Sequence, residues 1–249
     1  MKHPPINDSF VQQASHAFGQ LVRTVTDAQL RALMRAVFYR AGRYEAFCRS
    51  PLTVAGSDSA AGSALRHTIR TGRLLRAVAG SFSLASRDLM LAAALLMEAG
   101  TTEAFAQGGA VRLTSRGALY PVAVLSTLLV HDARCGIDRT KRESLEGLML
   151  QAAWLAGQTG VPAPEGTGAA GILEHEARVV ALCMQLDRFA ALYESTRVAT
   201  HGTAALRWSG QMVPAPVRCE NLPDARWTLI DQPRKDHDDD TTEPRLATG

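Results

Sequence analysis

The chain has 249 residues, of which 46% are apolar and only 6% aromatic. That length and composition suit one buried domain with a tail, and they favour a helical core of small and aliphatic side chains. The longest uninterrupted apolar stretch, residues 89–97, is too short to cross a bilayer, and the first residues have no signal-peptide pattern. We therefore expect a cytoplasmic protein with no membrane partner.

The formal net charge of +3 is spread unevenly along the chain. Residues 231–249 hold three Lys or Arg and six Asp or Glu, which leaves 24 basic against 18 acidic residues in residues 1–230. A basic body followed by an acidic tail suits a polyanionic partner. The four cysteines show no Cys-x-x-Cys spacing, so the sequence indicates neither a zinc knuckle nor a dithiol redox site.

Apolar residues recur at helical spacing along the chain up to about residue 200. The second helical segment opens with a capping-box pattern in which Thr26 is the expected N-cap. The fourth has Ser86 as its expected N-cap, and the fifth accommodates Pro121 in its first turns. The predicted helices span residues 10–25, 26–41 with a continuation to 47, 62–79, 86–99, 116–132, 139–155 and 171–200.

These segments predict an all-α fold, a bundle of about seven helices over residues 10–202. A flexible arm of residues 1–9 precedes it. Periodicity ends after Gly202, so residues 203–230 are expected to be irregular, with short extended pieces. The acidic tail of residues 231–249 is expected to be disordered.

One predicted helix carries a row of arginines. Arg66, Arg70, Arg73 and Arg76 recur at intervals of four, three and three residues, and no carboxylate lies in that stretch. Guanidinium groups suit phosphate, so this row is a candidate contact surface for single-stranded nucleic acid or a nucleotide. The alternative is an ordinary solvated helix face.

His131-Asp132 is a His-Asp doublet after an apolar run. It is a candidate for metal ligation if His67 and Asp187 supply further ligands. The residues that follow indicate a helix end, where the alternative role for His131 is a cation favoured by the helix dipole.

The order of several short segments resembles the HD-domain 3′→5′ exoribonucleases of the YhaM type, and more distantly the HD-like domain of conjugative TraI_2 proteins. The resemblance covers about residues 29–200 and implies an HD-like bundle. The segments that carry it are Phe47 to Pro51, Ser57-Asp58, Gly62 to Thr68, Leu95 to Gly100, Thr114 to Gly117, Leu155-Ala156-Gly157 and Glu176 to Asp187-Arg188.

The resemblance also implies that the metal site of that family is degenerate here. His67 alone survives among the metal positions, Glu98 is a longer carboxylate in place of an aspartate, and Asp187 matches a second family acid. A divalent ion that activates water needs several convergent nitrogen or oxygen ligands. The remaining five ligand positions hold apolar residues, namely Met97, Val122, Leu155, Ala156 and Met184. Of these, Met97, Val122 and Met184 are expected to converge near His67 in the core.

The sequence thus predicts a degenerate, non-catalytic HD-like protein that needs no cofactor and binds nucleic acid, nucleotide or a protein partner. One alternative is an active metal-dependent phosphohydrolase or exonuclease with rearranged ligands such as His67, Glu98 and Asp187, or His131 and Asp132. A second alternative is an interaction module of a conjugation or mobile-element system.

Overall fold

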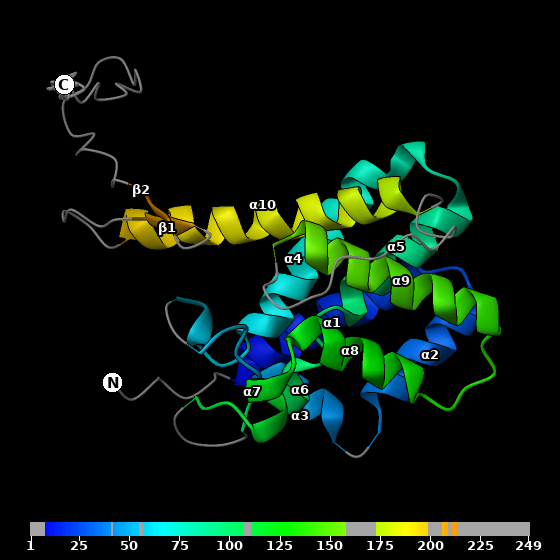
Figure 1. Cartoon of the computed structure of the whole chain (residues 1–249), viewed down its shortest axis with the longest axis horizontal. Helices are drawn as coiled ribbons and strands as arrows, with labels where there is room; N and C mark the ends of the chain where they lie inside the picture. The colour runs from blue at the N-terminus through cyan, green and yellow to red at the C-terminus, as the bar shows by residue number, and fades with distance from the viewer. Residues whose placement is uncertain are drawn as a thin grey trace, which may run out of the picture.

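The computed structural model describes residues 8–40, 42–54, 57–106, 111–157 and 173–198, and two strands at 206–208 and 211–213. The predicted all-α class is confirmed (Figure 1). The helices of the described residues are α1 (Asp8–Thr24), α2 (Ala28–Phe38), α3 (Arg43–Arg49), α4 (Ser63–Val78), α5 (Leu84–Leu96), α6 (Thr101–Ala104), α7 (Ser115–Leu119), α8 (Val122–His131), α9 (Arg139–Leu155) and α10 (Glu174–Val198), with short 3-10 turns at Ser57–Ser59 and Ala79–Ser81.

The predicted boundaries of the helical domain need small corrections. Asp8 already belongs to α1, so the predicted arm of residues 1–9 is too long. In the segment expected to be irregular with short extended pieces, two such pieces are paired as antiparallel strands, β1 (Leu206–Trp208) and β2 (Gln211–Val213). The rest of that segment and the acidic tail of residues 231–249 lie outside the described residues. No helix in the described part of the chain combines the length and apolarity needed to span a bilayer.

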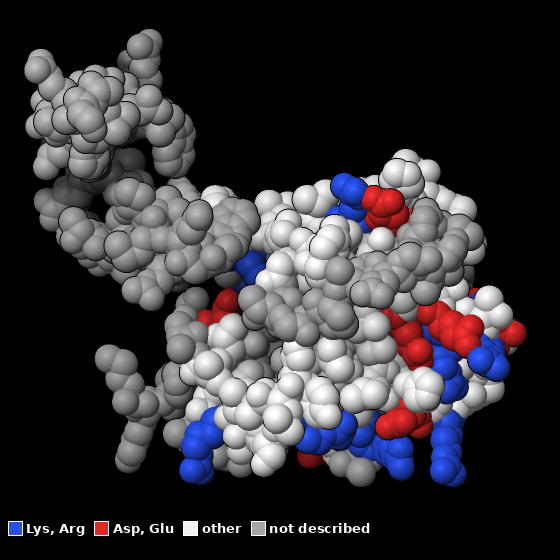
Figure 2. Space-filling view, viewed as in Figure 1, with Lys and Arg blue, Asp and Glu red and all other residues white. Residues whose placement is uncertain are grey.

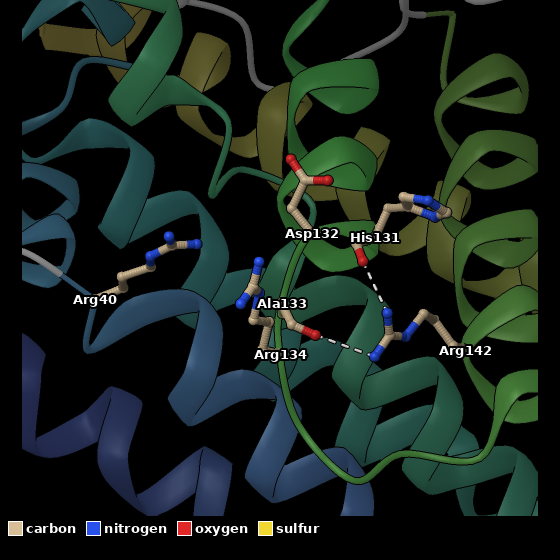
Figure 3. A pocket seen from close by; sticks show the side chains of 6 residues that line it. All are labelled: Arg40, His131, Asp132, Ala133, Arg134 and Arg142. Atoms are coloured by element: carbon tan, nitrogen blue, oxygen red, sulfur yellow. Dashed lines mark hydrogen bonds between the residues drawn. The ribbon is translucent and has the colours of Figure 1, made fainter.

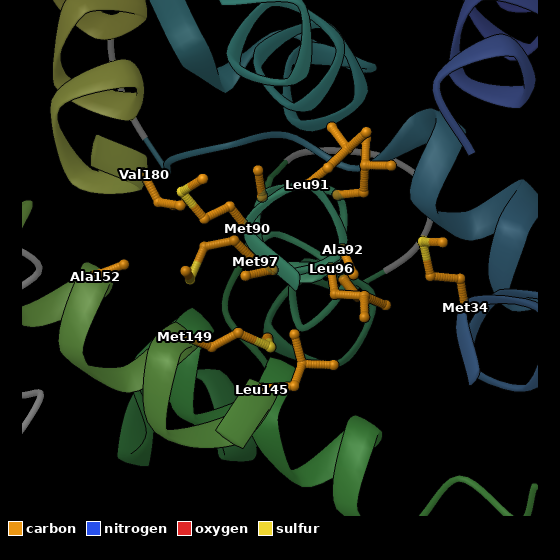
Figure 4. Close-up of a cluster of buried hydrophobic side chains, with 14 of the residues drawn as sticks. Met34, Met90, Leu91, Ala92, Leu96, Met97, Leu145, Met149, Ala152 and Val180 are labelled. Atoms are coloured by element: carbon orange, nitrogen blue, oxygen red, sulfur yellow. The ribbon is translucent and has the colours of Figure 1, made fainter. Parts of the chain in front are cut away.

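The central helix is α5, which packs against α2, α4, α9 and α10. Residues 90–96 of α5 are all buried, and they are apolar on every side, as a fully enclosed helix requires. Figure 4 shows Met90 and Met97 between Val180 of α10 and Met149 of α9. The core therefore lies around α5, with the longer helices arranged about it.

Two aspartates fix the turn between α1 and α2. Asp27 is the N-cap of α2, because its Oδ1 accepts two backbone N–H groups of the first turn at 2.8 and 3.0 Å. Burial favours a higher pKa for Asp27, but Lys141 and those N–H donors outweigh it and hold the pKa below its ordinary value of 3.8. Thr26, the predicted cap, instead donates its hydroxyl at 2.6 Å to Oδ2 of buried Asp88, which ties α5 to this turn.

Two other helix predictions are wrong, one in its start and one in its continuity. Ser83 caps α5, since its Oγ accepts the N–H of Ser86 at 3.2 Å. The helix expected over residues 116–132 is divided into α7 and α8. The cause is local: Tyr120 is extended (φ −125°, ψ 135°), as a residue before proline tends to be, and Pro121 becomes the N-cap of α8.

Gly100 brings the end of α5 against the backbone of α8. A Cβ at Gly100 would lie 2.4 Å from the carbonyl oxygen of Val122 and 2.6 Å from the backbone nitrogen of Ser126. The Gly100 N–H donates to Ser126 Oγ at 2.7 Å, and that hydroxyl donates to the carbonyl of Met97 at 2.6 Å. This close approach has room only for a residue without a side chain.

We predict that Gly100→Ala destabilises the protein by about 3 kcal/mol, because rigid backbone of α8 must move to admit the methyl group. The matched control is Gly147→Ala in α9, where an added Cβ meets no heavy atom within 4 Å. The control should stabilise the protein by about 0.5–1 kcal/mol through helix propensity. Urea unfolding of both variants measures this difference, and equal effects would contradict the close packing of α5 on α8.

Candidate functional site

His67 lies on the buried side of α4 and is held by α10. Its Nδ1 lies 2.7 Å from Oδ2 of Asp187, which is also buried, and the ring N–H donates to the carboxylate. Such charge-assisted bonds are stronger than bonds between neutral groups. The contact joins two residues 120 positions apart, so it fixes how α10 lies on α4.

Three further charged side chains extend this contact on both sides. Arg70 Nε lies 3.0 Å from Oδ1 of Asp187. On the opposite side, Oε1 of buried Glu98 lies 3.7 Å from His67 Nε2 and 3.5 Å from Nη2 of Arg188. We call these five residues, from α4, from α10 and from the end of α5, the His67 network.

The His67 network brings together the three predicted candidates His67, Glu98 and Asp187. The sequence reasoning missed Arg188 as a member and assigned Arg70 a different role. Signals for both were present: Arg70 follows His67 by one helical turn, and Arg188 adjoins Asp187.

The electrostatics of the His67 network favour ion pairing over metal binding. Asp187 faces the guanidinium of Arg70, and Glu98 faces that of Arg188, so the formal charges of these four side chains cancel. A divalent cation beside either carboxylate would also face an arginine. Among the described residues, no three His, Cys, Asp or Glu side chains are grouped to hold a metal ion.

The contacts to Glu98 are longer than those to Asp187. His67 Nε2 and Glu98 Oε1 are both buried, and neither has a hydrogen-bond partner within the described part of the chain. Buried polar atoms are normally paired, so this side of the network is the less well satisfied one. The structure therefore supports a strong contact between α4 and α10 and a looser one to the end of α5.

The apolar positions predicted to replace the metal ligands do not all converge. Met97 and Met184 are buried in the main core, and Leu155 and Ala156 belong to the same cluster. Val122 is different, because it is only partly buried and packs against a small separate cluster of Ala104, Phe105 and Leu125. The expected convergence of Val122 with Met97 and Met184 is therefore wrong, since Pro121 starts a new helix whose first turn faces that second cluster.

His131 and Asp132 take no part in the His67 network. His131 is the last residue of α8 and Asp132 is its C-cap, as the helix-end alternative proposed. The exposed His131 Nδ1 lies 3.3 Å from Oε1 of Glu146 in α9. Burial raises the pKa of Glu146, and the proximity of His131 opposes this effect.

A second feature at the end of α8 is a polar surface hollow of about 630 Å³ (Figure 3). Its lining includes Arg40 after α2, Arg134 in the α8–α9 loop and Arg142 in α9, together with His131, Asp132 and Ala133. Arg142 donates to the carbonyls of His131 and Ala133 at 2.8 and 3.0 Å, which holds the end of α8 in place. We call this feature the arginine hollow. Three separate segments build it, so no spacing in the sequence indicates it.

The predicted arginine row of α4 is interrupted. Arg66, Arg73 and Arg76 are exposed, but Arg70 is half-buried and paired with Asp187. The row is therefore not a continuous set of solvated cations, although three of its four members remain at the surface.

We predict strong energetic coupling between His67 and Asp187. His67→Ala and Asp187→Ala should each cost about 3–5 kcal/mol, because each leaves a buried polar partner unsatisfied. The double variant should cost less than the sum by about 1–3 kcal/mol. The control Arg178→Ala removes a solvent-facing ion pair of α10 with Glu174 and should cost under about 0.5 kcal/mol. Additive effects in urea unfolding would show that the two side chains are not coupled in solution.

No family model, no curated protein and no solved structure matches this chain. The resemblance to HD-domain proteins accordingly stays a prediction, and the function is argued from the geometry of the two sites.

Proposed function

We propose that this chain is a non-catalytic HD-like helical protein that binds a polyanion, single-stranded nucleic acid, in the arginine hollow. The observation that carries the proposal is the arrangement of Arg40, Arg134 and Arg142 around one concave surface. Because the hollow is concave, a phosphate chain lying in it meets cations from more than one side. Phosphate contacts of this kind supply most of the affinity for nucleic acid without reading its sequence.

The non-catalytic part of the proposal rests on the His67 network. His67 is engaged by Asp187, and an arginine faces each carboxylate. Met97 and Met184, at two positions where the resemblance implies metal ligands, are buried and have no ligand atom of the kind that holds Mg²⁺ or Mn²⁺. In this proposal the His67 network holds α4, α5 and α10 together. A metal-dependent hydrolase would instead require Arg70 to move away from Asp187 and Arg188 to move away from Glu98.

Charge distribution supports a polyanionic partner for this surface. Residues 1–230 carry six more Lys and Arg than Asp and Glu. In Figure 2, Lys and Arg atoms lie along the lower edge with some Asp and Glu atoms among them, where Figure 1 shows α3, α2 and the loop between α8 and α9. The proposal places the protein in the cytoplasm, where nucleic acid is present and thiols such as the free Cys48 and Cys183 stay reduced.

We favour the arginine hollow over the arginine row of α4 as the surface that binds nucleic acid. The row lies on the convex surface of one helix, and Arg70 in its middle is held by Asp187. Arg73 and Arg76 remain exposed on α4. They make a fair comparison because replacing them removes the same charge as replacing two arginines of the hollow.

We predict that Arg40→Ala/Arg134→Ala weakens binding of single-stranded RNA or DNA across sequences alike. The slope of log affinity against log salt should flatten by roughly 0.7 for each phosphate that the variant no longer neutralises. Arg142 is left in place because it holds the end of α8. Fluorescence anisotropy over a salt series measures both quantities.

The matched control is Arg73→Ala/Arg76→Ala, which should retain the parent's salt slope. Equal weakening in the two double variants would mean that overall charge, and not the hollow, governs binding. A parent protein that fails to bind at low salt would refute the proposed function outright.

A further inference from the structure

A second and smaller hollow is built by residues of α1, α2 and α3. Its volume is about 170 Å³. Phe18 of α1 and Met34 and Phe38 of α2 line it and are buried, so its floor is apolar. Tyr39, which follows α2, and Tyr44 of α3 also line it. We call this hollow the aromatic pocket, because the two phenylalanines and the two tyrosines bring aromatic rings to it.

Tyr39 presents an accessible ring that is already held in place. The residue has 75% of its surface exposed. Its ring stacks on that of Tyr44, with the two centroids 5.8 Å apart and the two planes 18° from parallel. The ring of Tyr44 in turn contacts the buried rings of Phe18 and Phe38, at centroid distances of 5.8 and 6.2 Å. A ring held in this way loses little freedom when a ligand binds, so more of the contact free energy is retained as affinity.

Cations lie on both sides of Tyr39 along the chain. Arg35 precedes it by one helical turn, so both residues lie on one side of α2, and both line the aromatic pocket. Arg40 follows it at a Cα–Cα distance of about 3.8 Å and lines the arginine hollow. Among the described residues that line the aromatic pocket, Arg23 of α1 is the other charged one, and there is no Asp or Glu. The aromatic pocket therefore suits a ring that carries anionic groups on its flanks.

A base of single-stranded nucleic acid has this chemistry, since a phosphate lies on each side of it along the strand. The volume favours a single base as the occupant, because 170 Å³ is below the roughly 300 Å³ at which pockets for drug-sized ligands begin. Proteins that bind single strands without reading their sequence combine a basic groove with an exposed aromatic ring on which a base stacks. We propose that Tyr39 is this ring: a base enters the aromatic pocket and stacks on Tyr39, while the neighbouring phosphate lies at Arg40 in the arginine hollow.

This role of Tyr39 rests on the proposed function of the arginine hollow and adds a selectivity to it. The arginines of the hollow attract the phosphates of single and double strands alike. The bases of a duplex are stacked and paired, so a base reaches the aromatic pocket only after its pair is opened, which costs free energy. Stacking on Tyr39 therefore contributes to the affinity for single strands and not to the affinity for a duplex.

The experiment compares Tyr39→Ala with the parent by fluorescence anisotropy of the full chain. The probes are oligo(dT), an abasic oligonucleotide of the same length and a DNA duplex. Tyr39→Ala should weaken binding of oligo(dT) roughly 5- to 150-fold, which is the effect of losing one stack between a base and an aromatic ring. It should leave the affinities for the abasic strand and the duplex unchanged, because neither presents a base to Tyr39. The slope of log affinity against log salt should stay that of the parent, since no phosphate contact is lost.

Two further variants serve as controls, and far-UV circular dichroism verifies that each variant is folded. Tyr39→Phe keeps the ring and should bind oligo(dT) as the parent does. Tyr193→Ala removes a tyrosine of α10 that has 54% of its surface exposed and lies outside the lining of the aromatic pocket, and it should also bind as the parent does.

The outcomes separate this role of Tyr39 from the proposed function. If the parent binds oligo(dT) and Tyr39→Ala binds it equally well, the role of Tyr39 is overturned and the proposed function stands. Equal weakening for oligo(dT) and for the abasic strand would also overturn it, because Tyr39 would then act on the backbone and not on a base. A parent protein that binds none of the three probes at low salt would overturn both.

Discussion

The contact between His67 and Asp187 is the interaction on which the rest of the structure depends. It joins α4 to α10 at 2.7 Å, and through Glu98 the same network reaches the end of the central helix α5. Burying charges costs free energy unless they are paired, so the network is stable only when all three helices are in place. Apolar packing around α5 is nondirectional, and methionines tolerate several arrangements. Polar contacts hold α5 at both ends, through Asp88 near its start and Glu98 just beyond its end. They therefore select one position of α5 among the arrangements that apolar packing alone would allow.

The His67 network and the arginine hollow have no residue in common. Asp187 and Arg188, the charged residues of α10 between Val179 and Tyr193, both belong to that network. The cations of the arginine hollow lie instead at the ends of α2 and α8, where Arg142 also holds the backbone.

Local signals in the sequence predicted most of the fold. The span 139–155 matches α9, and the all-α class follows from periodicity alone. The errors came from competing short-range chemistry: Asp27 outcompeted Thr26 as the cap, and Pro121 divided one expected helix. The meeting of His67, Glu98 and Asp187 was anticipated as a possible ligand set, but the arginines that neutralise it were not assigned to it. The arginine hollow could not be predicted, because Arg40, Arg134 and Arg142 meet only after tertiary packing.

The most direct test of this account is the metal content of the protein, because the central claim is that the His67 network is an ion-pair network and not a metal centre. The measurement is elemental analysis of full-length protein purified without chelators, for the parent and for His67→Ala. The account predicts substoichiometric Mn, Fe, Zn and Ni in both proteins, with no difference between them. One or more of these metals per chain in the parent, absent from His67→Ala, would contradict it and restore the metal-dependent hydrolase as the better description.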